Sequence, residues 1–262
     1  MSRLLKPFLA LVPLWRVLLD VIYPRRCRVC LKPLPERDAA RPLGEWFCEA
    51  CETGLAKLEP PFCEVCSQPY DGQITGPFRC GNCADRQFAF EFAVAAYRAE
   101  EAVRELVHQF KYGRDLSLRG ALAGLLAQVL QDPRLRGEDL AQWCLVPVPL
   151  HRGRQNDRGF NQSWELCRRL SQRTGLRRVR ALKRRHATEK QSRLTRARRL
   201  KNLKGAFAMK RGFRGPKSRL RGWKVLLVDD VFTTGATAHA CASVLRREGG
   251  AEKVVVIAVA RG

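Results

Sequence analysis

The sequence lacks a convincing secretory signal and any hydrophobic run long enough to cross a membrane. Residues 8–22 are apolar and follow basic residues, but Arg16 and Asp20 interrupt them, and no small-residue cleavage site follows. The segment is also too short and too charged for a spanning helix. We therefore expect an amphipathic N-terminal segment at residues 1–22 and a cytoplasmic protein without a transmembrane span. Packing of this segment on the protein and contact with the inner membrane surface are the two alternatives for it.

Acidic side chains are scarce, above all between residues 152 and 224. The whole chain has 49 Lys and Arg against 25 Asp and Glu, a net charge of +24. Residues 152–224 hold 26 basic and 3 acidic side chains, so nearly all of the excess falls there. Such concentration indicates a polyanionic partner, and we predict single-stranded nucleic acid. A solvated basic surface is the alternative.

Aromatic side chains are also few in the most basic part of the chain, residues 177–217, where Phe207 and Phe213 stand alone. Stacking on aromatic rings is one of the ways in which proteins hold single-stranded bases. We therefore expect salt-sensitive binding to the nucleic-acid backbone rather than base-specific recognition, with the choice between DNA and RNA left open.

Cysteine, by contrast, is abundant, with eleven residues. Eight of them form four Cys-x-x-Cys pairs: Cys27/Cys30, Cys48/Cys51, Cys63/Cys66 and Cys80/Cys83. Two residues between cysteines let a tight turn present both sulfurs to one ion, and two turns complete a tetrahedral zinc site. The pattern resembles a double zinc ribbon, which we place at residues 23–88. Sequential pairing and interleaved pairing both fit the spacing, and redox activity is an alternative to the structural role.

From residue 89 onward, predicted strands alternate with predicted helices. We expect strands at residues 90–97, 144–148, 224–228 and 253–259, and helices at residues 100–112, 116–131, 162–173 and 237–248. This order predicts an α/β fold with a parallel, doubly wound sheet at residues 89–262, behind a small N-terminal zinc-ribbon domain. Ligands of such sheets bind beyond the carboxyl ends of the strands.

The segment Val-Asp-Asp-Val-Phe-Thr-Thr-Gly-Ala-Thr, residues 228–237, falls at such a strand end. Residues 233–237 begin the next predicted helix, whose unsatisfied N–H groups and dipole attract an anion. Gly235 allows close approach of the backbone. Asp229 and Asp230 suit sugar hydroxyls or a magnesium ion rather than a phosphate. The segment therefore predicts a sugar phosphate with a metal, and an Asp pair capping a helix is the alternative.

These residues resemble the phosphoribosyl pyrophosphate (PRPP) signature of type I phosphoribosyltransferases. The whole chain is similar to the ComF/GntX family, which is named for a role in competence for DNA uptake. The supporting segments are Phe110-Lys111-Tyr112, Val146-Pro147-Val148-Pro149, Arg158-Gly159-Phe160-Asn161-Gln162, Lys190-Gln191 and Asn202-Leu203-Lys204-Gly205-Ala206-Phe207. Their order and spacing together are specific, whereas each alone is weak.

The resemblance implies PRPP binding with magnesium. Asp229 and Asp230 would contact the ribose hydroxyls, and the 5′-phosphate would be bound by Thr233, Thr234, Gly235, Ala236 and Thr237. The loop after residues 146–149 would face pyrophosphate. Lys111 and Arg158 are charge-complementary candidates for the pyrophosphate, with a plain surface cation as the alternative. No catalytic residue is identified.

Three functions fit these features. The first is a ComF-type protein that handles single-stranded DNA in the cytoplasm during DNA uptake, with the PRPP site as a ligand pocket. The second is an active phosphoribosyltransferase, whose acceptor base the sequence does not identify. The third is a scaffold whose zinc module docks a component of the DNA-uptake machinery, such as a DNA translocase.

Overall fold

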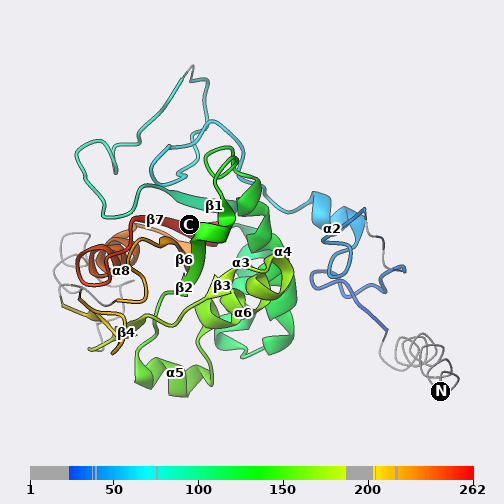
Figure 1. Ribbon diagram of the computed structural model, residues 1–262. Coiled ribbons are helices and arrows are strands. Elements are labelled where there is room, and N and C mark those ends of the chain that lie inside the picture. Colours follow the sequence, from blue (N-terminus) through cyan, green and yellow to red (C-terminus); the bar gives the residue numbers. More distant parts are fainter. Residues whose placement is uncertain are drawn as a thin grey trace, which may run out of the picture. The chain divides into compact units, whose positions relative to one another are not determined.

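The computed structural model (Figure 1) describes residues 24–36, 38, 40–74, 76–186, 203, 205–215 and 218–262. The predicted segment at residues 1–22 and the motif residues Lys190, Gln191, Asn202 and Lys204 lie outside this described part of the chain. No helix in the described part is both long and apolar enough to cross a membrane. The chain divides into two compact units, Met1–Leu55 and Ala56–Gly262, which we describe separately.

The described part of the first unit is a small zinc-ribbon-like module. Its one named helix is the short α2, Glu49–Thr53. A single bridge joins Arg26 and Pro33 in antiparallel fashion. Cys27, Leu43, Phe47 and Leu55 are buried, so one cysteine and a few apolar side chains make up the core of this unit.

The second unit is built on a five-stranded sheet in the order β1-β7-β6-β2-β3, and all of its neighbours are parallel. The strands are β1 (Ala93–Arg98), β2 (Trp143–Pro147), β3 (Arg177–Arg178), β6 (Lys224–Phe232) and β7 (Lys253–Arg261). The central strands are continuous β-branched and leucine runs, as strands covered on both faces require. This confirms the predicted parallel α/β sheet.

Helices cover both faces of this sheet (Figure 1). The helices and 3₁₀ turns of the unit are α3 (Glu101–Tyr112), η1 (Leu116–Leu118), α4 (Arg119–Ala127), η2 (Gln128–Gln131), η3 (Leu140–Gln142), α5 (Arg152–Arg158), α6 (Gln162–Thr174) and α8 (Ala236–Arg247). Successive strand residues point to opposite faces, so Val225 and Leu227 of β6 pack in the core cluster that includes α8, while α6 packs against β6 and β2. The sheet is therefore doubly wound.

Two parts of the structure differ from the sequence prediction. The predicted helix at residues 116–131 is broken into η1, α4 and η2. Strand β6 continues to Phe232, because Asp229, Val231 and Phe232 pair with β7. The Asp pair therefore lies within strand β6, just before its last two residues, and not in the loop that follows it. The structure also contains a hairpin that the sequence did not indicate, formed by β4 (Leu182–Arg184) and β5 (Phe207–Met209).

The second cysteine quartet belongs to the same unit as the sheet. Its cysteines share a buried core cluster with Phe90 and Ala93. The turn at the first pair is tied to β1, because Ala93 N–H donates to Val65 C=O at 2.8 Å and Ser67 Oγ donates to Ala93 C=O at 2.7 Å. The double zinc ribbon domain at residues 23–88 stays a prediction; the compact unit that holds the second quartet is Ala56–Gly262.

Candidate functional site

A cavity of about 1020 Å³ lies at the carboxyl ends of β6 and β2. Its wall comes from the end of β6, the start of α8, the loop after β2, the last turn of α3, α5 and the β4–β5 hairpin. The charged side chains that line it are Lys111, Arg114, Arg154, Asp157, Arg158, Arg184, Asp229 and Asp230. This is the position at which parallel α/β sheets bind their ligands.

The loop between β6 and α8 presents an uncapped helix start to this cavity. Helix α8 begins at Ala236, and its N-cap is Gly235, which offers no side-chain hydrogen bond. The first N–H groups of a helix have no acceptor within the helix. Gly235 provides no side-chain cap, so this helix start is suited to a ligand anion. The predicted phosphate residues Thr233, Thr234, Gly235, Ala236 and Thr237 all line the cavity.

Only glycine fits at position 235. Its φ is +74°, in the left-handed region, and an added Cβ would lie 2.9 Å from the Phe232 ring. The Phe88 and Phe90 rings would be 3.4 Å and 3.5 Å away. These three aromatic rings back the loop from below, because Phe90 stacks on Phe88 and meets Phe232 edge to face. These packed aromatic rings therefore fix the position of the loop.

Asp230 is buried, and one of its carboxylate oxygens is left for a ligand. Oδ1 accepts from Lys111 Nζ at 2.9 Å and from Val231 N–H at 2.7 Å. Oδ2 is buried and has no hydrogen-bond partner among the described residues. Buried carboxylate oxygens are normally satisfied, so this one fits a ribose hydroxyl or the water shell of a magnesium ion. The carboxylate oxygens of Asp230 are thus compatible with the predicted magnesium–PRPP.

Asp229 is held differently. Its Oδ1 accepts from Ser163 Oγ at 3.1 Å and from Asp230 N–H at 3.0 Å. Burial raises the pKa of Asp229 to about 7, and the charge of Asp230 adds to this effect. A bound cation or a set of hydroxyl donors would favour the charged form of Asp229. The pair therefore favours a ligand that brings positive charge or donors.

Lys111 and Arg158, the two predicted pyrophosphate cations, both line the cavity. Lys111 is paired with Asp230, and although burial opposes its charge, the attraction of Asp230 keeps the pKa of Lys111 above its ordinary value. Arg158 ends α5, and its guanidinium lies 5.0 Å from the centre of the Tyr112 ring. In this structure Lys111 thus supports a carboxylate, while Arg158 is positioned by an aromatic face.

Sequence reasoning missed three further arginines in the cavity wall, Arg114, Arg154 and Arg184. Arg184 comes from the β4–β5 hairpin and lies over the Phe207 ring at 5.3 Å. Burial, followed by the charge of Arg154, lowers the pKa of Arg184. Arg154 comes soon after the segment at residues 146–149. A prediction of helix α5 from the sequence would have placed it near the cavity. Arg184 had no such signal, because only the hairpin brings it to the cavity.

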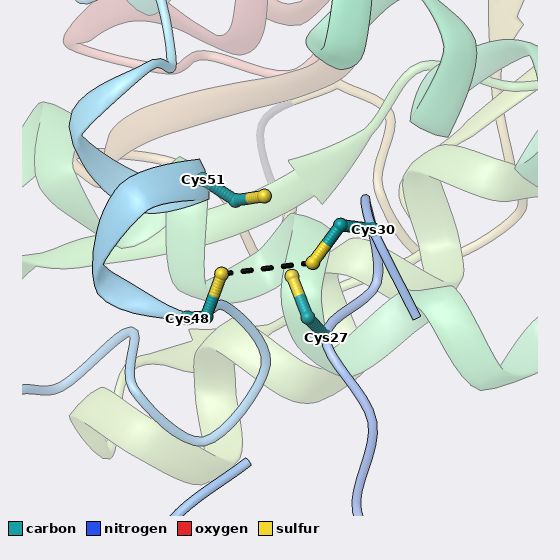
Figure 2. A group of neighbouring side chains, drawn as sticks. All are labelled: Cys27, Cys30, Cys48 and Cys51. Atoms are coloured by element: carbon teal, nitrogen blue, oxygen red, sulfur yellow. Dashed lines mark hydrogen bonds between the residues drawn. The ribbon is translucent and has the colours of Figure 1, made fainter. Parts of the chain in front are cut away.

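The cysteine pairs form two quartets in sequential order, which decides between the two pairings that the spacing allowed. In each quartet the four sulfur atoms lie within 4.8 Å of one another. Figure 2 shows the first quartet, Cys27, Cys30, Cys48 and Cys51, in which the sulfurs of Cys30 and Cys48 are 3.7 Å apart. The second quartet comprises Cys63, Cys66, Cys80 and Cys83, all buried.

The second quartet already favours a thiolate. A hydrogen bond from Cys66 lowers the pKa of Cys63 to about 4, and the N–H groups of Cys80, Cys66 and Val65 act in the same direction. Cys80 N–H lies 3.3 Å from the Cys63 sulfur. A thiolate among closely spaced sulfurs is the ligand set that zinc prefers.

Comparison with known proteins agrees with this picture. Residues 18–84 match the model of the double zinc ribbon domain. A DNA utilization protein YhgH of Escherichia coli O6:H1 is 32% identical over 231 residues, which cover 87% of this chain and 93% of that protein. Competence protein F of Haemophilus influenzae is 29% identical over 82% of this chain and 90% of its own length. Competence protein ComFC of Bacillus subtilis is 25% identical over 80% and 82%. The match to the domain model and the two quartets together support zinc as the metal of this chain.

Proposed function

Because the chain belongs to the ComF family, we propose that it binds magnesium–PRPP in the cavity at the end of β6 and handles single-stranded DNA in the cytoplasm during DNA uptake. The names of its relatives, a DNA utilization protein and two competence proteins, support the second part. The first part rests on one observation. A buried carboxylate oxygen without a partner and an uncapped helix start line the same cavity.

Each group of the site has a role in this proposal. The N–H groups and hydroxyls of residues 233–237 bind the 5′-phosphate. Asp229 and Asp230 accept from the ribose hydroxyls. Arg158, with Arg154 and Arg184, binds the pyrophosphate through charge-assisted hydrogen bonds. Magnesium, when bound with PRPP, neutralises part of the pyrophosphate charge. Lys111 holds Asp230 in place through their ion pair.

Exposed arginines that lie over two indole rings support the proposed binding of single-stranded DNA. Arg180 and Arg178 lie 3.9 Å and 5.8 Å from the centre of the Trp164 ring, and Arg177 lies 5.1 Å from that of Trp223. All three arginines are exposed. Such pairs of an arginine and an indole offer cations for phosphates and aromatic faces for bases. The sequence had pointed to two phenylalanines as the aromatics of this stretch.

Phe207, one of those two phenylalanines, is buried in β5 and so cannot stack on bases. The predicted basic stretch is described only in part, since residues 187–202 lie outside the described chain. Among the described residues, the half-buried indoles of Trp164 and Trp223 therefore add aromatic groups that the sequence analysis did not single out.

The test of the proposal is a titration of zinc-loaded protein with fluorescent single-stranded DNA, with and without magnesium–PRPP. We expect tight binding that weakens steeply with salt, giving a log–log slope of several units. A shift on adding PRPP would show that the two sites communicate. Absence of binding at low salt would discard the DNA proposal, and a flat response to salt would discard its electrostatic basis.

An active phosphoribosyltransferase is the alternative use of the same cavity. A nitrogen of the acceptor would form a bond to the anomeric carbon of the ribose, while the bond from that carbon to the pyrophosphate oxygen breaks. The arginines of the cavity would stabilise the departing pyrophosphate. Release of pyrophosphate from PRPP with free bases, in the absence of DNA, would favour this alternative over a binding role.

A docking scaffold for the DNA-uptake machinery is favoured by one feature of the first unit. Val29 and Leu31, on the turn of its first cysteine pair, are exposed apolar side chains. An exposed apolar turn on a zinc module is a feature of surfaces that bind other proteins. Co-purification of a DNA translocase that is lost on zinc chelation would support this role.

A further inference from the structure

Arg261, the last residue of β7, connects the second cysteine quartet to the loop between β6 and α8. We call this loop with the start of α8, residues 233–237, the phosphate loop. Its side chain is buried, with only 6% of the residue exposed. Its Nε donates to the C=O of Cys66 at 3.0 Å, and a terminal nitrogen donates to the C=O of Phe232 at 3.2 Å. Further bonds reach Gln68 Oε1 at 2.5 Å and the C=O of Gly262. Cys66 is a member of the quartet, and Phe232 is the residue before Thr233.

The cysteine side of this connection is a turn whose shape the metal would fix. In residues 63–68, Ser67 N–H donates to Cys63 C=O and Cys63 N–H donates to Gln68 C=O, both at 2.8 Å. This turn aims the sulfurs of Cys63 and Cys66 at one point. It also aims the Cys66 C=O and the Gln68 side chain at Arg261. A metal that holds both sulfurs therefore also holds two acceptors of the guanidinium.

The other side of the connection is the floor of the phosphate loop. The Phe232 C=O accepts from Arg261 and from Gly262 N–H, the latter at 2.9 Å. The guanidinium lies 5.6 Å from the centre of the Phe232 ring, the ring that would clash with any Cβ at position 235. A shift of Phe232 therefore moves the base on which the loop rests.

We propose that Arg261 is a positioning residue that makes binding of the 5′-phosphate depend on metal occupancy of the second quartet. The proposal rests on the proposed PRPP site. With the metal bound, the turn at residues 63–68 holds Arg261, Arg261 holds Phe232, and the helix start stays set for a phosphate. Without the metal the turn loosens and the loop loses this support. By linkage, bound PRPP strengthens metal binding at this quartet by the same factor.

Arg134 supplies a matched control. It also contacts the turn of the second quartet, because it donates to the C=O of Glu64. It is paired with Asp132 and lies over the rings of Phe62 and Phe92. It resembles Arg261 in its contact with the turn and in its aromatic neighbours, but it is not a neighbour of Phe232 or of the phosphate loop among the contacts of the structure.

The experiment compares the zinc-loaded full-length chain with its Arg261→Gln, Arg261→Lys and Arg134→Gln variants. Calorimetry with magnesium–PRPP should show a roughly tenfold weaker affinity for Arg261→Gln. Arg261→Lys should also bind more weakly, because an ammonium cannot bridge the acceptors as the planar fork does. Arg134→Gln should stay within about twofold of wild type. Amide hydrogen exchange across residues 229–238 should quicken only in the Arg261 variants.

A second measurement needs no variant. In the wild type, magnesium–PRPP should slow the release of zinc to a chelator from the second quartet and leave the release from the first quartet unchanged. This measurement tests the proposal even if the Arg261 variants do not fold. Wild-type PRPP affinity and wild-type loop exchange in the Arg261 variants would overturn the proposal, as would equal protection of both quartets. If the wild type bound no PRPP, the proposed function would fall, and the exchange comparison would decide the coupling by itself.

Discussion

The first Cys-x-x-Cys turns of the two zinc ribbons have nearly the same backbone but very different surroundings. In the first, Leu31 N–H donates to Cys27 C=O at 2.9 Å, and in the second Ser67 N–H donates to Cys63 C=O at 2.8 Å. Leu31 and Ser67 both have a positive φ, 62° and 53°. The sulfurs of each quartet lie within the same 4.8 Å. The local structure is thus set by the Cys-x-x-Cys turn.

The environment of each turn is set by the residues around the cysteines. Leu31 is 64% exposed, whereas Ser67 at the equivalent position is 1% exposed and bonded to β1. Cys30 is exposed, and Cys66 is buried in the core of the α/β unit. The first ribbon is therefore a separate module, while the second is a structural part of the domain that carries the cavity.

The largest expected difference follows loss of one cysteine ligand in each ribbon. Cys66→Ser should lower the free energy of unfolding of the α/β unit by about 4 kcal/mol or more, because it removes the metal from a buried core. Cys30→Ser should lose one zinc equivalent but change the stability of this unit by less than about 0.5 kcal/mol. Urea unfolding followed by tryptophan fluorescence, together with metal analysis, measures both. Equal losses of unfolding free energy in the two variants would contradict the proposed difference between the two ribbons.

The exchange of residues between equivalent turn positions is the next test. Ser67→Leu should cost about 3 kcal/mol, because it forces a large side chain into a filled site and leaves the C=O of Ala93 without its donor. The midpoint of urea unfolding should move to lower concentration with little change in slope. A cost below about 1 kcal/mol would mean that the second turn is less tightly embedded than its contacts indicate.

The phosphate loop extends the comparison, because its aromatic floor belongs to the same unit as the second ribbon. Gly235→Ala should destabilise this unit by about 2 kcal/mol, since alanine at a φ of +74° is strained and its Cβ meets Phe232. PRPP binding should weaken in parallel. Thermal melting and calorimetry provide the two readouts, and a variant with wild-type values in both would show that the loop does not need this close contact.

The smallest effect is expected in the first ribbon. Leu31→Ser removes an exposed side chain and should change the melting temperature of the first unit very little, corresponding to less than about 0.5 kcal/mol. Zinc content should stay at the wild-type level. A clear loss of stability or of metal would show that Leu31 is covered in the folded protein, which would align the two ribbons more closely.

Regular spacing made much of this structure predictable from the sequence. The Cys-x-x-Cys pairs located both quartets, and the buried run ending at Val228 with the Thr-Gly segment located the cavity. The order of strands and helices predicted the parallel sheet. These features depend on local geometry and on periodicity, which one sequence contains in full.

Features that depend on distant contacts were not predictable in this way. The spacing of the second quartet does not reveal that Ser67 donates a hydrogen bond to β1. The spacing also does not reveal that Arg261 donates a hydrogen bond to the C=O of Cys66, which lies 195 positions earlier in the chain. The sequence also did not reveal that Lys111 pairs with Asp230, and the assignment of Lys111 to pyrophosphate stays a prediction.

The most direct test of the central claim is calorimetric titration with magnesium–PRPP of the zinc-loaded wild type and of the variant carrying Asp229→Asn with Asp230→Asn. Because Asn cannot supply the charged acceptors, the variant should bind no PRPP and still give a cooperative melting curve. Saturable binding by the wild type together with this loss would support the site at the end of β6. Unchanged binding by a folded variant would contradict it.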